Sequence, residues 1–234
     1  MKRYHQHILL PEIGMNGQAK ISEARVAIIG AGGLGTVVAG YLAAMGVGHI
    51  GIVDFDVVEE SNLHRQFLYT LSDIGQKKAI VLREKLHTQN DNIEIKAITE
   101  KLLPSNAVEI LTEYGVVCDC TDDLHTRIEL DKHCSLLTTP LVHGAVSEWQ
   151  GYLTVFHHTK KYSYRDVFEY QSLLDAQTCT MNGISSPICG IIGSYMANET
   201  IKIIVGAGTV LDGALLYVNG LNNVSRLIRM HKVF

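Results

Sequence analysis

The chain has 234 residues, of which 47% are hydrophobic and 19% are charged, and its formal net charge is -4. This length suffices for a domain with a sizeable core, and the composition is too apolar for intrinsic disorder. The mild negative charge argues against binding to nucleic acid or to an anionic membrane surface. Five irregularly spaced cysteines and a polar N-terminal stretch predict a cytoplasmic protein without a disulfide framework or a secretory signal.

Short apolar runs alternate with helix-like segments over the first two-thirds of the chain. The pattern predicts strands at 25–30, 49–54, 93–98, 116–120 and 140–145, and helices at 33–45, 75–89, 105–113 and 123–137. Such alternation is typical of a parallel sheet covered by helices on both faces. The uncharged run 26–53 contains eight glycines, so we interpret it as strand, turn, helix and strand rather than as a membrane span.

The last third of the chain follows a different pattern. Strands are predicted at 149–158, 214–220 and 224–234, joined by short turns and therefore antiparallel. Pro187 and Gly206 are suited to the start and the end of a helix between the first two. The segment 159–184 shows no clear period and is interpreted as a loop. We expect one α/β domain over 1–234, with a Rossmann-like doubly wound sheet that is parallel in its N-terminal part and has antiparallel C-terminal strands.

The stretch "GAGGLG" (30–35) follows a predicted strand and opens a predicted helix. Its glycines are Gly30, Gly32, Gly33 and Gly35, and Asp54 ends the next predicted strand. This combination is the fingerprint of a nucleotide-binding loop, in which helix N-terminal amides hold a phosphate and the acid accepts hydrogen bonds from ribose. NAD, FAD, S-adenosylmethionine and ATP all fit this description, so the loop predicts a nucleotide and not an activity.

Polar side chains then crowd into "SNLHRQ" (61–66). An enzyme that cleaves a triphosphate must neutralise charge on phosphate oxygens, and a guanidinium such as that of Arg65 suits this task. Asn62 and Gln66 can add hydrogen bonds, and Lys77 or Lys78 could reach the same phosphates from the start of a helix. Taken singly, each cation is more often a solvated surface charge, and only their joint placement predicts a triphosphate.

"CDCTDD" (118–123) places acids just past another predicted parallel strand, at the sheet edge where ligands of open α/β sheets bind. Asp122 could hold Mg²⁺, which prefers carboxylate and phosphate oxygens. The alternative is that Asp122 or Asp123 caps the helix that follows.

With these motifs the chain resembles the ThiF/MoeB/HesA family, bacterial relatives of the ubiquitin-activating enzymes. "RYHQHILLPEIG", "RVAIIGAGGLG", "IVDFDVVEESNLHRQFLY", "IGQKKA", "DCTDD", "GYLTVF" and "GIIGSYMANETIKIIVG" occur in the family's order. The resemblance implies an ATP- and Mg²⁺-dependent adenylyltransferase. Its substrate would be the C-terminal carboxylate of a small ubiquitin-like sulfur-carrier protein ending in Gly-Gly, for thiamine or molybdopterin synthesis or related sulfur transfer. It also implies a homodimer and a carrier-binding half at about 146–234, after a nucleotide-binding half at about 20–145.

By motif position, the resemblance assigns Gly30, Gly32, Gly33 and Gly35 to the phosphate loop and Asp54 to the ribose. It assigns Asn62, Arg65 and Lys78 to the triphosphate and Asp122 to Mg²⁺. In the ThiF branch a loop cysteine takes over the activated carrier, and Cys179 stands at that place, although an unreactive thiol is an equally good interpretation. Cys189 is expected in the core, and His157 and His158 are expected to face solvent.

Three positions depart from the family pattern. Gln6 replaces an arginine that reaches the partner subunit's ATP, so one positive charge is missing. Ser163 and Asp166 stand where the first zinc-binding cysteine pair would be, so no zinc is expected. Asp123 replaces an asparagine beside the metal-binding acid.

These departures keep other hypotheses open. One is a catalytically weak scaffold that binds ATP or a carrier. Another is an NAD-dependent oxidoreductase, supported only by the glycine loop and Asp54.

Overall fold

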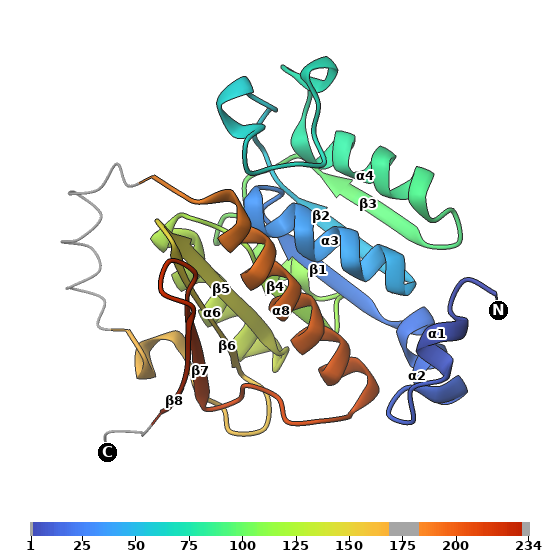
Figure 1. The fold of residues 1–234 in the computed structure, drawn as a ribbon, viewed down its shortest axis with the longest axis vertical. Helices are drawn as coiled ribbons and strands as arrows, with labels where there is room; N and C mark the ends of the chain where they lie inside the picture. Colours follow the sequence, from blue (N-terminus) through green and yellow to red (C-terminus); the bar gives the residue numbers. More distant parts are fainter. Residues whose placement is uncertain (1, 169–182, 231–234) are drawn as a thin grey trace.

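The structure is a computed structural model and describes residues 2–168 and 183–230. Within them lies an eight-stranded sheet of order β3-β2-β1-β4-β5-β6-β7-β8 (Figure 1). The strands are β1 (Arg25–Ile29), β2 (His49–Val53), β3 (Glu94–Ile98), β4 (Val116–Asp119), β5 (Leu141–Ser147), β6 (Gln150–Phe156), β7 (Ala214–Asn219) and β8 (Val224–Arg229). Strands β1 to β5 pair in parallel, and β6 to β8 are antiparallel. The predicted fold class is confirmed.

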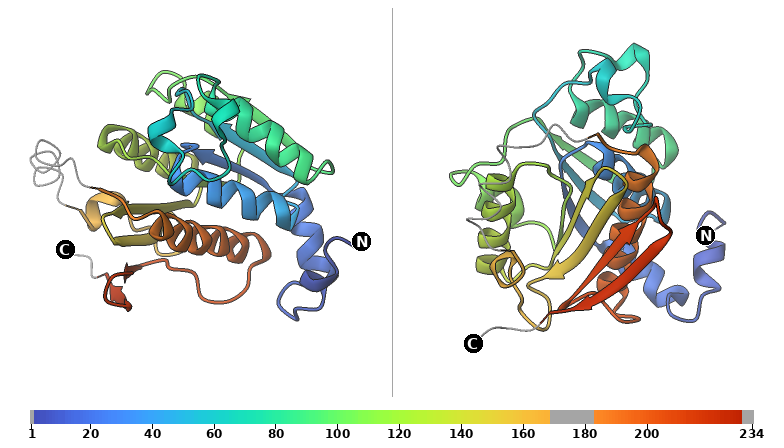
Figure 2. Two further views of the ribbon diagram at one scale, coloured as in Figure 1. Left: turned by 45° about the horizontal axis from the view of Figure 1, so that its top comes forward. Right: turned by 60° about the vertical axis from the view of Figure 1, so that its left-hand side comes forward.

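Helices cover both faces of this sheet (Figure 2). The helices are α1 (His5–Ile8), α2 (Gly14–Glu23), α3 (Gly33–Met45), α4 (Lys78–Gln89), α5 (Ala107–Leu111), α6 (Leu124–Leu137) and α8 (Ser186–Val205). One apolar cluster joins α3, α4 and α8 to one face of the sheet, and a second joins α5 and α6 to the other. Successive strand residues such as Ile28 and Ile29 belong to different clusters, because side chains alternate between the two faces of a strand.

Among the described residues, α8 is the one helix long and apolar enough to cross a membrane by length and composition. It packs against α3 and the strands β5 and β6. Ile192 and Met196 on it are fully buried. These contacts identify α8 as a core helix, because a sheet covered on both faces requires an apolar helix here.

The secondary structure departs from the sequence-based expectations in its details. Helix α4 begins at Lys78 instead of residue 75, because Lys77 is extended and pairs with Val57 in an isolated bridge. Helices α1 and α2 precede the first strand, where no element was predicted. The loop expected at 159–184 contains a short 3-10 helix, η3 (Tyr164–Asp166), and its residues 169–182 lie outside the described part of the chain.

The expectation that His157 faces solvent is wrong. Only 7% of its side chain is exposed, and its Nε2 lies 2.7 Å from Oδ1 of Asp131 on α6. His157 has a positive φ of 56°, which turns the chain back after β6 and brings the ring against that helix. His157 is buried because it pairs with Asp131, 26 residues away in the sequence. The local sequence around His157 gives no sign of this pairing.

The order of the strands locates the site. Connections from β1 lead to β2 and β3 on one side, whereas β4 and β5 lie on the other. The carboxyl ends of β1 and β4 therefore flank the point at which the strand order reverses. Ligands of open α/β sheets bind at such a point. The glycine loop follows β1, and the turn with Asp122 follows β4.

Candidate active site

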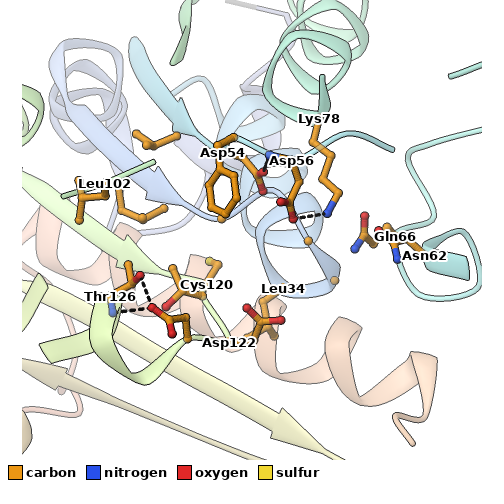
Figure 3. A pocket seen from close by; sticks show the side chains of 18 of the residues that line it. Leu34, Asp54, Asp56, Asn62, Gln66, Lys78, Leu102, Cys120, Asp122 and Thr126 are labelled. Atoms are coloured by element: carbon orange, nitrogen blue, oxygen red, sulfur yellow. Dashed lines mark hydrogen bonds and ion pairs between the residues drawn. The ribbon is translucent and has the colours of Figure 1, made fainter. Parts of the chain in front are cut away.

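A cavity of about 400 Å³ opens at this edge of the sheet (Figure 3). Its volume lies in the range of roughly 300–1,000 Å³ typical of small-molecule sites. Its lining contains most of the residues that the sequence analysis singled out, namely Gly30, Gly32, Gly33, Asp54, Asn62, Arg65, Gln66, Lys78 and Asp122. Segments from five parts of the chain thus meet in one cavity. Gly35 lies one turn into α3, behind this lining.

The glycine loop has the geometry that its sequence predicts. Gly30 has a φ of +95°, which an L side chain rarely adopts. A Cβ on Gly35 would collide with the carbonyl oxygen of Gly30, so the first turn of α3 can only pack this closely without a side chain. A Cβ on Gly32 would meet Nε2 of Gln66 only at 3.6 Å. The Gln66 side chain therefore lies directly beside the glycine loop, and both line the cavity.

Asp54 ties the loop to the end of β2. Its Oδ2 accepts a hydrogen bond from the amide of Ala31 at 2.7 Å, and its Oδ1 accepts one from the amide of Asp56 at 2.8 Å. Burial raises the pKa of Asp54, and these two amides and the charge of Lys78 oppose that shift. Each carboxylate oxygen keeps a second lone pair, so the group retains acceptor capacity for a ribose hydroxyl.

The residues 62–66 line one wall of the cavity. Asn62 is 9% exposed, and its Nδ2 donates to Oγ of Ser61 at 3.2 Å. Gln66 is 3% exposed, and its Oε1 has no hydrogen-bond partner among the described residues. A buried amide oxygen without a partner is costly, which indicates that a ligand or water completes it.

Arg65 is turned toward its own segment. Its guanidinium lies 2.9 Å from Nε2 of His64 and 3.3 Å from the carbonyl oxygen of Ser61. These contacts are weak and local, so a bound anion can replace them by drawing the flexible side chain into the cavity.

Lys78 rather than Lys77 reaches the cavity. Lys78 is 6% exposed, and its Nζ lies 3.0 Å from Oδ2 of Asp56 (Figure 3). Lys77 is exposed and is not part of the cavity lining. It donates to the carbonyl oxygen of Phe55. Because α4 begins at Lys78, this lysine and not Lys77 belongs to the cavity lining.

The two adjacent aspartates after β4 have different roles. Asp123 is the N-cap of α6, and its Oδ2 accepts from the amide and the hydroxyl of Thr126 at 2.9 and 2.6 Å. Asp122 is exposed, lines the cavity, and makes no hydrogen bond or ion pair within the described part of the chain. Figure 3 shows it across the cavity from Asn62, Gln66 and Lys78. The helix cap is therefore Asp123, which leaves the carboxylate of Asp122 available for a ligand.

A magnesium ion fits this arrangement. Mg²⁺ is usually bound through one or two carboxylates together with substrate phosphates, and keeps several waters. Asp122 could supply one such carboxylate, and substrate phosphates bound at the glycine loop would supply the other oxygens. Within residues 2–168 and 183–230 no cluster of three or more His, Cys, Asp or Glu side chains could hold a metal by itself.

Several residues of the site had escaped the sequence analysis. Asp56 pairs with Lys78, and Arg127 and Phe55 line the cavity. Tyr69 is 4% exposed, and its hydroxyl lies 2.8 Å from the carbonyl oxygen of Ala31 and 3.3 Å from that of Lys78. The alternation in "DFD" could have signalled Asp56, but no local pattern points to Arg127 or Tyr69.

The cysteines near the site are buried. Cys189 is 2% exposed, as expected, and packs beside Gly33. Burial raises the pKa of its thiol, although the charge of Arg65 opposes this. Cys179 lies outside the described residues. At the positions of the missing zinc-binding pair, Oδ2 of Asp166 accepts hydrogen bonds from the amide and the hydroxyl of Ser163, so these side chains cap η3.

Gln6 lies far from the cavity of its own chain. It is exposed on α1, next to Tyr4, which packs against Gly46 at the C-terminal end of α3. The glycine loop is at the other end of this 13-residue helix, roughly 20 Å away at 1.5 Å per residue. A contact between Gln6 and a nucleotide would therefore require a second protomer.

Comparisons with known proteins show which family the chain resembles. The ThiF family model matches residues 4–233. The adenylyltransferase and sulfurtransferase MOCS3 of Drosophila sechellia is 42% identical over 97% of this chain, which spans 51% of that relative. The sulfur carrier protein adenylyltransferase of Thermus thermophilus is 37% identical, over 99% of this chain and 88% of the relative.

Solved structures share the fold. Escherichia coli MccB crystallised with ATP superposes with a TM-score of 0.86 over 99% of this chain and 72% of MccB, at 20% sequence identity. This chain thus spans about half the length of the MOCS3 relatives and most of the bacterial one. From the family match over nearly its whole length, the chain belongs to the ThiF family.

Proposed function

We propose that this protein is an adenylyltransferase that activates the C-terminal Gly-Gly carboxylate of a small ubiquitin-like sulfur-carrier protein with ATP and Mg²⁺. The observation that carries this proposal is the meeting of a nucleotide loop, three phosphate-binding candidates and one free carboxylate in a single cavity. The names of the relatives, which describe adenylyltransferases of sulfur carriers, support the same substrate class.

The residues of the cavity would act by positioning and by neutralising charge. The glycine-loop amides and Lys78 would hold the phosphates, and Asp54 would orient the ribose. The carrier carboxylate would attack the α-phosphate in line, and pyrophosphate would leave. Mg²⁺, held by Asp122, would neutralise phosphate charge. Arg65 would gain its contacts as charge develops, so its contribution would be larger in the transition state than in the ground state.

An oxidoreductase is less consistent with this cavity. A nicotinamide dinucleotide keeps its pyrophosphate bridge intact, so it would leave Arg65, Lys78 and Asp122 without a task. The carrier could serve thiamine synthesis, molybdopterin synthesis or related sulfur transfer, and the cavity is compatible with all three. The carrier itself would decide among them.

The experiment is ATP–pyrophosphate exchange with Mg²⁺, with and without a carrier ending in Gly-Gly from the same genome. Exchange that depends on the carrier, and disappears when its last glycine is removed, would support the proposal. ATP binding without exchange with any encoded carrier would instead favour a scaffold. Tight binding of NAD in place of ATP would favour the oxidoreductase.

We further propose that the protein works as a homodimer through a groove between α3 and α8. The groove has a volume of about 650 Å³ and is lined mainly by apolar side chains, among them Val37, Tyr41, Phe67, Pro187, Ile191 and Tyr195. Phe67 is 64% exposed and Tyr41 52%, and large apolar side chains gathered in this way mark interaction surfaces. Light scattering should give twice the 25.8 kDa of the chain, and Phe67→Asp should shift the mass to that of one chain.

A further inference from the structure

A buried polar network lies directly behind the turn that carries Asp122. Asp119 ends β4 and is paired in register with His143 on β5. Nδ1 of His143 lies 2.7 Å from Oδ2 of Asp119. The other carboxylate oxygen, Oδ1, accepts from the amide and the hydroxyl of Thr121 at 3.0 and 2.7 Å. Arg127 on α6 donates to the carbonyl oxygen of Thr121 from Nη2 at 2.6 Å and from Nε at 3.3 Å.

The members of this network carry defined charges. Asp119 and His143 are both fully buried. Burial alone would raise the pKa of Asp119, but the hydrogen bond from His143 and the charge of Arg127 hold it below its usual value. Burial lowers the pKa of His143, so the imidazole is neutral and its Nδ1 carries the proton donated to Asp119. An ionised carboxylate at this depth is costly unless it is fully hydrogen-bonded.

This network does not merely fill the core. An apolar pair of similar volume in place of a buried charged pair is often as stable or more stable. The aromatic rings of Phe156, Tyr164 and Phe168 already pack around His143 and would accommodate an apolar side chain. A charged group placed there therefore calls for another reason.

The turn itself supplies that reason. The amide of Cys120 donates to the carbonyl oxygen of Ile29 at 2.9 Å. Thr121 is held by Asp119 on one side and by Arg127 on the other. Asp123 is committed to the cap of α6. Every residue from 119 to 123 except Asp122 is thus bound to a neighbour, and the backbone on both sides of Asp122 is fixed against β1, β5 and α6.

We propose that Asp119, His143 and Arg127 are positioning residues, which hold the turn 119–123 so that the carboxylate of Asp122 faces the cavity ready for Mg²⁺. This inference rests on the proposed function, because it takes Asp122 as the metal-binding carboxylate. His143 acts at a distance from the ligand and does not line the cavity. Partners of this kind, behind a metal ligand, typically change metal affinity about 10- to 100-fold when they are removed.

The test measures ATP binding by calorimetry without carrier, first in EDTA and then over a series of Mg²⁺ concentrations. His143→Leu removes the donor to Asp119. We expect it to bind ATP in EDTA as the wild type does, but to need about ten times more Mg²⁺ for half of the increase in affinity. His143→Asn keeps an amide nitrogen near the place of Nδ1 and should restore a Mg²⁺ response close to that of the wild type.

His133→Leu is the matched control. His133 is also buried, but its Nδ1 lies 2.7 Å from the carbonyl oxygen of Glu129 on its own helix, so the Mg²⁺ response should not change. If His143→Leu does not fold, Thr121→Val decides the question, because it replaces the hydroxyl that donates to Asp119 by a methyl group. It should raise the required Mg²⁺ in the same direction. Thr121 also lines the cavity, so ATP binding in EDTA must stay that of the wild type for the comparison to count.

Two results would overturn the inference while leaving the proposed function intact. One is a wild-type Mg²⁺ response in a folded His143→Leu variant. The other is an equal loss of ATP affinity with and without Mg²⁺, which would indicate general damage. Asp122→Asn tests whether Asp122 binds Mg²⁺ at all. If this variant responds to Mg²⁺ as the wild type does, the metal assignment fails, and the inference fails with it.

Discussion

The two walls of the cavity differ in how their side chains are held. The wall formed by residues 62–66 carries Arg65 and Asn62, whose side-chain hydrogen bonds within the described part of the chain reach only neighbours within four residues. The opposite wall, residues 119–127, is bound to Ile29 and His143, far away in the sequence. The cationic wall can therefore adapt to a reacting phosphate, whereas the acidic wall is set before any ligand binds.

This difference suggests a division of labour. Side chains that gain contacts only during the reaction lower its barrier without tightening ground-state binding. A preset carboxylate, by contrast, costs little reorganisation when a metal binds. Substitutions on the first wall should thus change rates most, and substitutions around the second wall should change metal dependence or stability.

Arg65→Ala tests the adaptable wall most directly. We expect carrier-dependent ATP–pyrophosphate exchange to fall about 100-fold or more in kcat, because a donor to the developing charge is lost. The Kd for ATP should change far less. Arg83→Ala removes a guanidinium paired with Glu84 on the surface of α4 and should leave both unchanged. Equal losses of kcat and of ATP affinity in Arg65→Ala would contradict a role in the transition state.

Lys78→Ala should weaken ATP binding about 10- to 100-fold, the loss expected for a charged hydrogen bond. Its neighbour provides the control, because Lys77 is exposed, does not line the cavity, and donates to the backbone carbonyl of Phe55. Lys77→Ala should bind ATP as the wild type does, which calorimetry in EDTA would show. A similar loss in both variants would mean that overall charge, and not the position of Lys78, attracts the nucleotide.

Tyr69→Phe tests whether the glycine loop and α4 are held together by one hydroxyl. Burial raises the pKa of Tyr69, so the hydroxyl keeps its proton and donates. Its loss should lower the free energy of unfolding by about 1 kcal/mol and weaken ATP binding slightly. Urea unfolding would measure the first effect. Tyr41→Phe, which removes an exposed hydroxyl, should leave stability unchanged, and an unchanged stability in Tyr69→Phe would show that the loop needs no such tie.

Adjacent aspartates allow a comparison within the preset wall. Asp123→Ala removes the cap of α6 and should lower the free energy of unfolding by about 1 kcal/mol, with the Mg²⁺ dependence of ATP binding retained. Asp122→Ala should leave stability within about 0.5 kcal/mol of the wild type and abolish that Mg²⁺ dependence. Thermal unfolding would measure the stability of each variant, and calorimetry would measure the Mg²⁺ dependence of its ATP binding. If Asp122→Ala lost stability and Asp123→Ala lost the Mg²⁺ dependence, Asp122 would be the helix cap and Asp123 the metal ligand.

Gln6→Arg should have the smallest effect, an increase of a few-fold in the rate of exchange. The added charge would reach the cavity of a second protomer, since Gln6 lies beyond the far end of α3 in its own chain. The double variant Gln6→Arg/Phe67→Asp provides the control. As a monomer it should not show the increase in exchange rate, because no second protomer is present. A rate that does not respond to Gln6→Arg in the dimer would mean that the contact between protomers is absent here.

Local sequence patterns determined much of this protein. The alternation of apolar runs with helix-like segments predicted a doubly wound sheet, because strands buried on both faces and the helices that cover them have recognisable patterns. The glycine loop and Asp54 were predicted together, since a tight turn after a strand needs glycines at set positions. The crowding of Asn62, Arg65 and Gln66 within one short stretch likewise pointed to phosphate.

The resemblance chose between neighbours of equal chemistry by motif position, but the residue types left the choice open, and only the tertiary structure supplied its physical reason. Lys78 and Lys77, or Asp122 and Asp123, differ by one position in the sequence, but the point at which α4 or α6 begins sends one side chain into the cavity and the other elsewhere. The pairs Asp119–His143 and Asp131–His157 join residues 24 and 26 positions apart. Such pairs arise when strands and helices are brought into register, and periodicity along a single chain carries no record of that register.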